Sequence, residues 1–187
     1  PGATSKLIGS PGTGAEIAFN TGKSPFNSQL FRRAVFRALD PWSDIDEVWG
    51  GEGVVTLGIP APRSDWLLSE DAMRTGFADV DRAAELLSES GVVPTGPIEI
   101  TVGQFGDSYL LQARKVADAL AILGFESTIR ELTTRKFADD VWIGGDYQVF
   151  VGAQAPVDGV SDDLFSVHHS DGLWNTTGYS SDELDGL

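Results

Sequence analysis

SPFNSQLFRRAV, residues 24–35, carries the clearest structural pattern in the chain, and it follows the alternating segment EIAFN at residues 16–20. The alternation predicts a strand, and Pro25 is expected to close the loop after it. Asn27 is expected to cap a helix over residues 28–39. Apolar residues recur at i, i+4 and i+8 on one side of that helix, with arginines opposite. The pattern therefore predicts a strand followed by an amphipathic helix.

A second short helix and a long irregular stretch are expected next. Pro41 is expected to stop the first helix, because proline lacks the N–H that an interior helical position needs. Ser43 can cap a helix that runs to Trp49, and the Gly50–Gly51 pair would end it. Residues 54–76 show no sustained period, so we expect an irregular segment that is functional or crosses between parts of the protein.

The second half of the chain alternates between helical and strand-like segments. Asp79 is expected to cap a helix that runs to Ser90 and ends at Gly91. Its inward side chains are expected to be Val80, Ala83, Ala84 and Leu87. The later segments are predicted as strands over residues 98–102 (half-buried), 125–132 and 147–151, and as helices over residues 108–123 and 134–143. This order predicts an α/β layer with parallel strand pairs and right-handed crossovers.

Composition excludes several classes of function. The 187 residues include 28 acidic and 13 basic side chains, for a formal net charge of −15. This balance argues against nucleic acid and against anionic lipid, since both require clustered Lys and Arg. It favours a soluble surface, and it could also attract a cationic ligand. Cysteine is absent, which excludes disulfides, a thiolate nucleophile and cysteine metal sites.

Two short motifs have simple structural interpretations. Gly22-Lys23-Ser24 resembles the tail of a phosphate-binding loop, but Ile17 stands where that motif needs its first glycine. We interpret the tripeptide as a turn. The His168-His169 pair lacks the spacing of a metal site, so a surface pair or a helix end is the better interpretation.

Ligands of parallel α/β sheets bind beyond the carboxyl ends of the strands. The turn after Val151 is such an end, and its sequence, GAQAPVDG, is unusual. Asp158, Asp162 and Asp163 follow it without the spacing of a calcium loop, so helix capping and a ligand role both remain open for this cluster. Trp174 is the tryptophan most expected to be exposed, because it lies in a Gly- and Ser-rich loop. No serine–histidine or paired-carboxylate arrangement can be assigned.

The order and spacing of residues along most of the chain resemble a known family. The residues that carry the resemblance are Phe19, Asn20, Pro25, Phe26, Asn27, Arg32, Ala34, Ala83, Leu86, Leu87, Gly91, Tyr147, Asn175, Gly178, Tyr179, Ser180 and Asp185. From about Ala15 to its end, the chain resembles the family 5 extracellular solute-binding proteins of ABC importers, which bind peptides, nickel and related ligands. The resemblance implies a periplasmic-binding-protein type II-like lobe, in which helices flank a mixed, mostly parallel sheet.

The same resemblance implies a function and a setting. The protein would be a two-lobed receptor that closes like a hinge on a small solute or oligopeptide and delivers it to a membrane permease. Residues 15–187 would be most of the second lobe of a longer protein, and residues 1–14 are expected to be a linker or loop because they are rich in Gly, Pro, Ser and Thr. The receptor would be extracytoplasmic, either periplasmic or lipid-anchored at the outer face of the cell membrane, and monomeric. It would perform no catalysis and need no cofactor or metal.

Peptide-binding members of the family place a tryptophan and an aspartate after the strand that corresponds to residues 147–151. Here those positions fall on Ala153 or Gln154 and on Pro156 or Val157, so the sequence departs from the pattern. Asp158 is close enough to anchor a peptide amine through a charge-assisted hydrogen bond. The predicted ligand-binding residues are Gln154, Ala155, Asp158, Thr134 and Trp174.

Two other functions stay open at this stage. An α/β hydrolase or transferase would need a nucleophile and base that the sequence does not supply in a recognisable arrangement. An interaction domain that docks on a permease or another envelope protein would bury residues 152–162 in an interface.

Overall fold

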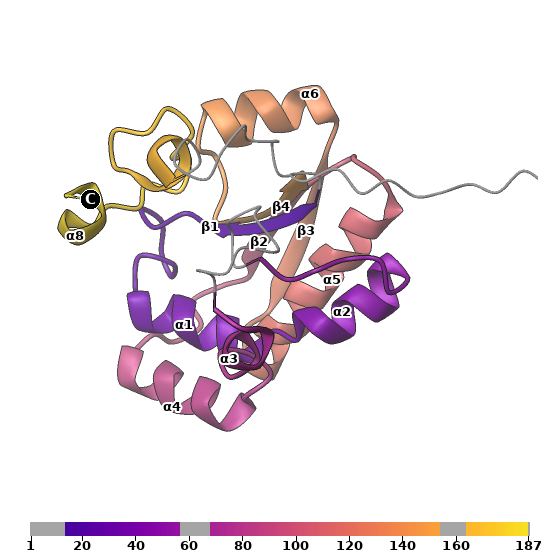
Figure 1. The fold of residues 1–187 in the computed structure, drawn as a ribbon, viewed down its shortest axis with the longest axis vertical. Coiled ribbons are helices and arrows are strands. Elements are labelled where there is room, and N and C mark those ends of the chain that lie inside the picture. Colours follow the sequence, from indigo (N-terminus) through magenta and orange to yellow (C-terminus); the bar gives the residue numbers. More distant parts are fainter. Residues whose placement is uncertain (1–13, 57–67, 154–163, 187) are drawn as a thin grey trace, which may run out of the picture.

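The computed structural model describes residues 14–56, 68–153 and 164–186, and it contains a sheet flanked by helices (Figure 1). The strands are β1 (Ala15–Phe19), β2 (Ile98–Gly103), β3 (Ser127–Leu132) and β4 (Val149–Ala153). Their order in the sheet is β1-β4-β2-β3. β2 is parallel to β3 and to β4, whereas β1 is antiparallel to β4. The predicted mixed, mostly parallel sheet is confirmed.

Helices cover both faces of the sheet. In Figure 1 the larger helices lie below it and α6 lies above it. The helices below are α1 (Gln29–Ala38), α2 (Pro41–Trp49), α4 (Val80–Ser90) and α5 (Asp107–Ile122). The helix above is α6 (Thr134–Phe137), which continues into the π-helical η1 (Ala138–Ile143). The alternation of β4 follows from this arrangement, since Val149 and Val151 join the core with α1, α4 and α5 while Phe150 joins the core with Phe137.

Two predicted helix caps are wrong by one to three residues. Ser28 caps α1, with its hydroxyl accepting from the Phe31 backbone N–H, and Asn27 lies outside the helix. Asp40 caps α2, because its carboxylate accepts from the Ser43 N–H. Pro41 therefore follows α1 and also begins α2. The first position of a helix is one where the N–H that proline lacks has no partner within the helix.

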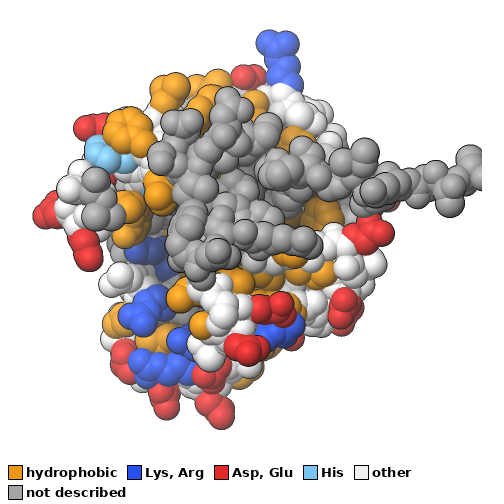
Figure 2. Space-filling model, in the orientation of Figure 1, with side chains coloured by type: hydrophobic (Ala, Val, Ile, Leu, Met, Phe, Trp, Pro, Cys, Tyr) orange, Lys and Arg blue, Asp and Glu red, His pale blue; other side chains and the backbone are white. Residues whose placement is uncertain are grey.

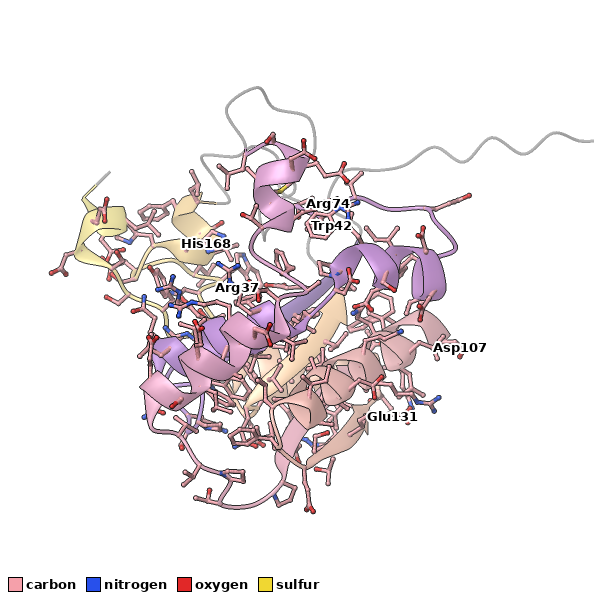
Figure 3. All side chains as sticks on the ribbon, turned by 90° about the horizontal axis from the view of Figure 1, so that it is seen from below. Arg37, Trp42, Arg74, Asp107, Glu131 and His168 are labelled. Carbon is pink, nitrogen blue, oxygen red and sulfur yellow. The ribbon has the colours of Figure 1, made fainter. Side chains whose placement is uncertain are left out.

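The segment expected to be irregular contains a short helix, α3 (Glu70–Arg74). Ser69 caps it, and Arg74 pairs with Glu70 at 2.8 Å. The Arg74 guanidinium also lies 4.4 Å from the ring centroid of Trp42, and Figure 3 shows the two residues together. This cation–π contact attaches α3 to α2. The part of the segment at residues 57–67 lies outside the described residues, as does the predicted linker apart from Gly14.

The inward face of α4 is only partly as predicted. Asp79 and Gly91 cap the helix as expected, and Ala83 is buried. Val80 and Ala84 face solvent, whereas Leu86 is buried in their place. The helix lies outside α1 and buries only a narrow stripe, so the wider stripe expected from sequence was wrong.

β2 is more buried than its alternation suggested. Thr101, expected to face water, is fully buried together with Ile100 and Val102. β2 lies between β3 and β4 in the sheet, and helices cover it on both sides. Position in the sheet therefore overrides the polar half of the pattern.

Two short elements complete the described chain, namely η2 (Leu164–His168) and α8 (Asp182–Asp185). None of the helices in residues 14–56, 68–153 and 164–186 is both long and apolar enough to cross a membrane. Figure 2 shows Asp and Glu side chains around the margin of one face, in keeping with the acidic excess of the sequence.

Candidate functional site

The carboxyl ends of the three parallel strands meet at one edge of the sheet. β2 ends at Gly103, β3 at Leu132 and β4 at Ala153. β1 begins at the same edge, because Ala15 pairs with Ala153. We call this side of the sheet the carboxyl edge. It is the place where parallel α/β sheets bind ligands.

Aromatic side chains gather at the carboxyl edge. We define the aromatic wall as Trp49, Phe105, Tyr109 and Trp142. Phe105 lies two residues after the end of β2, and its ring centroid lies 5.4 Å from that of Tyr109 and 6.1 Å from that of Trp142. Tyr109 meets Trp49 edge-on at 5.3 Å. All four side chains are partly exposed, so the wall presents ring surface beside the strand ends.

Two glycines make room for these rings. A Cβ on Gly103 would lie 2.1 Å from the Phe105 ring. A Cβ on Gly152 would lie 2.7 Å from the ring of Phe137, which is buried behind Phe105 and Trp142. Real side chains do not approach so closely, so glycine at both positions lets the rings pack on the backbone of the strand ends.

A buried polar chain supports the wall from behind. Trp49 Nε1 donates to Gln112 Oε1 at 3.1 Å, and Gln112 Nε2 donates to Asp44 Oδ2 at 2.7 Å. Asp44 is 6% exposed and Gln112 is 5% exposed. Burial raises the pKa of Asp44, and the hydrogen bond from Gln112 opposes that shift. These two hydrogen bonds join α2 to α5 and fix the orientation of the Trp49 indole.

The predicted site residues lie in three places. Thr134 begins α6 at the carboxyl edge, is exposed, and its hydroxyl donates to the Gln104 carbonyl at 3.3 Å. Trp174 is 54% exposed, as expected, but it lies on the turn after η2, where its N–H donates to the Ser166 carbonyl. Gln154, Ala155 and Asp158 lie outside the described residues, as do Asp162 and Asp163.

The turn that contains Trp174 docks on the opposite edge of the sheet. Thr21, just after β1, donates from its backbone N–H to the Thr177 carbonyl at 2.8 Å. The Tyr147 hydroxyl donates to the Thr176 carbonyl at 2.9 Å, and burial raises the pKa of Tyr147 to about 12. β1 runs from the carboxyl edge to this point, so the described residues do not bring Trp174 together with Thr134.

Several residues that carried the family resemblance hold this turn in shape. The Asn175 amide donates to the carbonyls of His169 and Tyr179, and its oxygen accepts from the Thr177 hydroxyl. Asp185 accepts from the Ser170 N–H at 2.9 Å, which lowers the pKa of its carboxyl. These side chains therefore have structural roles within the fold.

The remaining sequence motifs are structural as well. Gly22 and Lys23 lie in a turn, and Lys23 pairs with Asp146 at 3.1 Å. His168 ends η2, as the helix-end interpretation expected, and His169 packs on the Phe165 ring at 4.6 Å. Across the described residues, no three His, Asp or Glu side chains are grouped closely enough to hold a metal ion.

Sequence reasoning missed the aromatic wall. Trp49 lies more than 50 residues before Phe105 and Tyr109 in the sequence, and each of the three has an ordinary helical or loop context. The one available signal was the position of Phe105, two residues after a buried strand that ends in glycine.

Comparisons with known proteins point to one family. The profile of the bacterial extracellular solute-binding proteins, family 5 Middle, matches residues 3–175. Heme-binding protein A of Haemophilus influenzae is 34% identical over 77 residues, which are 41% of this chain and 14% of that protein.

Solved structures share the fold. The AppA protein of Clostridium difficile superposes with a TM-score of 0.80 at 23% identity, over 95% of this chain and 37% of its own. The oligopeptide-binding protein AppA of Bacillus subtilis, solved with a nonapeptide, gives a TM-score of 0.79 at 19% identity, over 93% of this chain and 37% of its own. This chain thus spans little more than a third of the length of these two proteins. Given the profile match over residues 3–175 and an α/β fold of the periplasmic-binding-protein type II kind, the chain belongs to the family 5 bacterial extracellular solute-binding proteins.

Proposed function

We propose that this chain is the ligand-capturing lobe of the substrate-binding component of an ABC importer, for peptides or peptide-like solutes. The observation that carries the proposal is the carboxyl edge itself. Three parallel strands end there beside the partly exposed rings of the aromatic wall, in a chain of the family 5 solute-binding proteins. The peptide-bound structure of Bacillus subtilis AppA supports peptides as the ligand class.

Residues 15–187 act as one lobe of a two-lobed receptor. The ligand lies between the carboxyl edge and the other lobe, and it stabilises the closed arrangement because only that arrangement contacts it from both sides. The chain binds and orients its ligand and performs no catalysis. Its partner is a membrane permease, and the receptor works as a monomer outside the cytoplasm, either periplasmic or lipid-anchored.

The anchoring groups in this proposal are those predicted from sequence. Asp158 binds the ligand's ammonium group, and Gln154, Ala155 and Thr134 line the same cleft. The exposed hydroxyl-bearing residue Thr134 at the start of α6 supports this placement. Trp174 is the weakest member of the set, because its turn is attached to the far end of β1.

Native mass spectrometry of the receptor that contains this chain, purified without denaturant, tests the proposal. A bound mass that is lost on denaturation and fragments as a peptide ladder is the expected result. The absence of any bound mass, combined with no melting shift across peptide, sugar and metal panels, would contradict it.

A further inference from the structure

We propose that the aromatic wall binds a flat apolar group of the ligand, such as the aromatic side chain of a peptide, and that Gln112 is the positioning residue that holds Trp49 in the wall. This inference rests on the proposed function, since it assigns a chemical preference to the same carboxyl edge. The observations that support it are the hydrogen bonds from Trp49 to Gln112 and from Gln112 to Asp44.

Burying a polar side chain costs free energy unless it is hydrogen-bonded. The buried polar or charged side chains among the described residues are Asp44, Thr101 and Gln112, and two of these three bond to each other. A buried carboxylate and a buried amide destabilise the fold unless their hydrogen bonds are made. The hydrogen bonds that Asp44 and Gln112 make between α2 and α5 are therefore needed to offset the cost of burying these side chains.

The side chain that bridges Trp49 and Asp44 must have a particular chemistry. Indole offers only a donor, and a carboxylate offers only acceptors, so a side chain that joins them must accept at one end and donate at the other. Gln112 does so, accepting from Trp49 Nε1 and donating to Asp44. An apolar side chain of the same length would fill the space but leave the indole without its partner.

Trp49 lies at the end of a helix. It is the last residue of α2, and Gly50 follows it in the left-handed conformation at φ 64°. Helix ends fray, so the ring needs a fixed contact to keep one orientation. Gln112 supplies it on one side, and the edge-on contact with Tyr109 supplies it on the other.

The rings of the aromatic wall suit one class of ligand group. The four side chains of the wall are partly exposed, and the Tyr109 hydroxyl is turned to the Gly14 carbonyl at 3.5 Å. Rings of this kind bind other flat apolar groups by offset stacking or edge-to-face contact. A ligand side chain such as Phe is therefore preferred over Ala at this position.

Isothermal titration calorimetry on the receptor that contains this chain tests the inference. The probes are two pentapeptides that differ only in Phe or Ala at one position, with that position moved along the peptide in a small set. The wild type is expected to prefer Phe at one position by about ten-fold. Gln112→Leu is expected to remove most of that preference, measured as the ratio of the two affinities.

Two further variants keep the test decisive. Lys115→Met is the matched control, because Lys115 pairs with Glu47 and so joins the same two helices, and it is not a partner in the hydrogen bonds of Trp49, Gln112 and Asp44. It should keep the Phe preference. Tyr109→Leu removes a ring of the aromatic wall that takes no part in the hydrogen bonds of Trp49, Gln112 and Asp44. It should lose the preference for the Phe peptide even if Gln112→Leu fails to fold.

A double-mutant cycle separates positioning from general loosening. In a Trp49→Ala background, Gln112→Leu should have no further effect on the Phe preference, since the residue that it positions is gone. Additive losses, or a wild type that binds both peptides equally, would overturn the inference while leaving the proposed function intact. A receptor that binds no peptide at all would overturn the proposed function as well.

Discussion

The side-chain amide of Gln112 donates to the carboxylate of Asp44 over 2.7 Å, and both side chains are buried between α2 and α5. This bond attaches the helix that ends in Trp49 to the helix that begins beside the carboxyl end of β2. It thus links the packing of the lobe to the shape of the candidate ligand site.

The buried carboxylate predicts a pH-dependent difference in stability. The folded-state pKa of Asp44 is raised above its ordinary value of 3.8, chiefly by burial. Its contribution to stability is therefore fully present below that value and is lost as pH rises through the folded-state pKa. Asn cannot ionise and can still accept from Gln112, so Asp44→Asn should gain stability relative to the wild type as pH rises across this window.

Urea unfolding of both proteins at a series of pH values measures that difference. Asp46→Asn removes the same charge from an exposed position on the same helix and is the control. A difference that stays constant with pH for Asp44→Asn, or falls as pH rises, would contradict the prediction.

A methyl group at Gly152 should disturb the packing behind the aromatic wall. The added Cβ would lie 2.7 Å from the Phe137 ring, and the core there is closed. Gly152→Ala is expected to lower the free energy of unfolding by about 1–3 kcal/mol. Chemical denaturation measures it, with Gly96→Ala as the control, because a Cβ there meets nothing within 4 Å. Equal effects of the two substitutions would show that the ring moves aside freely.

The cap of α1 gives a test between neighbouring residues. Ser28 accepts from the Phe31 N–H, whereas Asn27 is exposed and precedes the cap. Ser28→Ala should cost about 1 kcal/mol of stability and Asn27→Ala much less. Thermal or urea unfolding of the two variants measures both losses. A larger loss for Asn27→Ala than for Ser28→Ala would restore Asn27 as the cap.

Asn175 should control the local stability of the C-terminal turn. Its side chain bonds to His169, Thr177 and Tyr179, so Asn175→Ala removes three hydrogen bonds within this turn. We expect the loss of these three bonds to lower the local free energy of unfolding of this turn by about 1–2 kcal/mol. Hydrogen exchange should show faster exchange at residues 170–186 with the sheet unchanged. Ser180→Ala, at an exposed position in the same turn, should leave the exchange as it is.

Asp158→Ala tests the predicted amine anchor. A charge-assisted hydrogen bond to an ammonium group predicts that affinity for a free-amine peptide falls about ten-fold or more, while the melting temperature of the receptor changes by only a few degrees. Calorimetry with a free-amine peptide and its N-acetylated form measures the effect, and Asp171→Ala, at an exposed position, is the control. An unchanged affinity would remove Asp158 from the site.

Most of the fold could be predicted from local patterns. The alternation at residues 16–20 and the continuous apolar run near Val149 indicated strands, and Asp79 with Gly91 bounded a helix, because each of these signals acts over a few neighbouring residues. The errors arose where two signals competed. Ser28 and Asn27 are both good caps, and only the backbone geometry selects one. Thr101 has a polar side chain, yet the position of β2 between two strands buries it.

The residue order was also enough to indicate the family, since the spacing of motifs such as Asn175 to Asp185 follows from how that turn holds itself together. The aromatic wall could not be predicted in this way. Trp49, Phe105 and Trp142 become neighbours only when the parallel strands bring the ends of distant segments to one edge. Side-chain chemistry and short-range periodicity determine helices, strands and turns, whereas a site made from long-range contacts exists only after the sheet has formed.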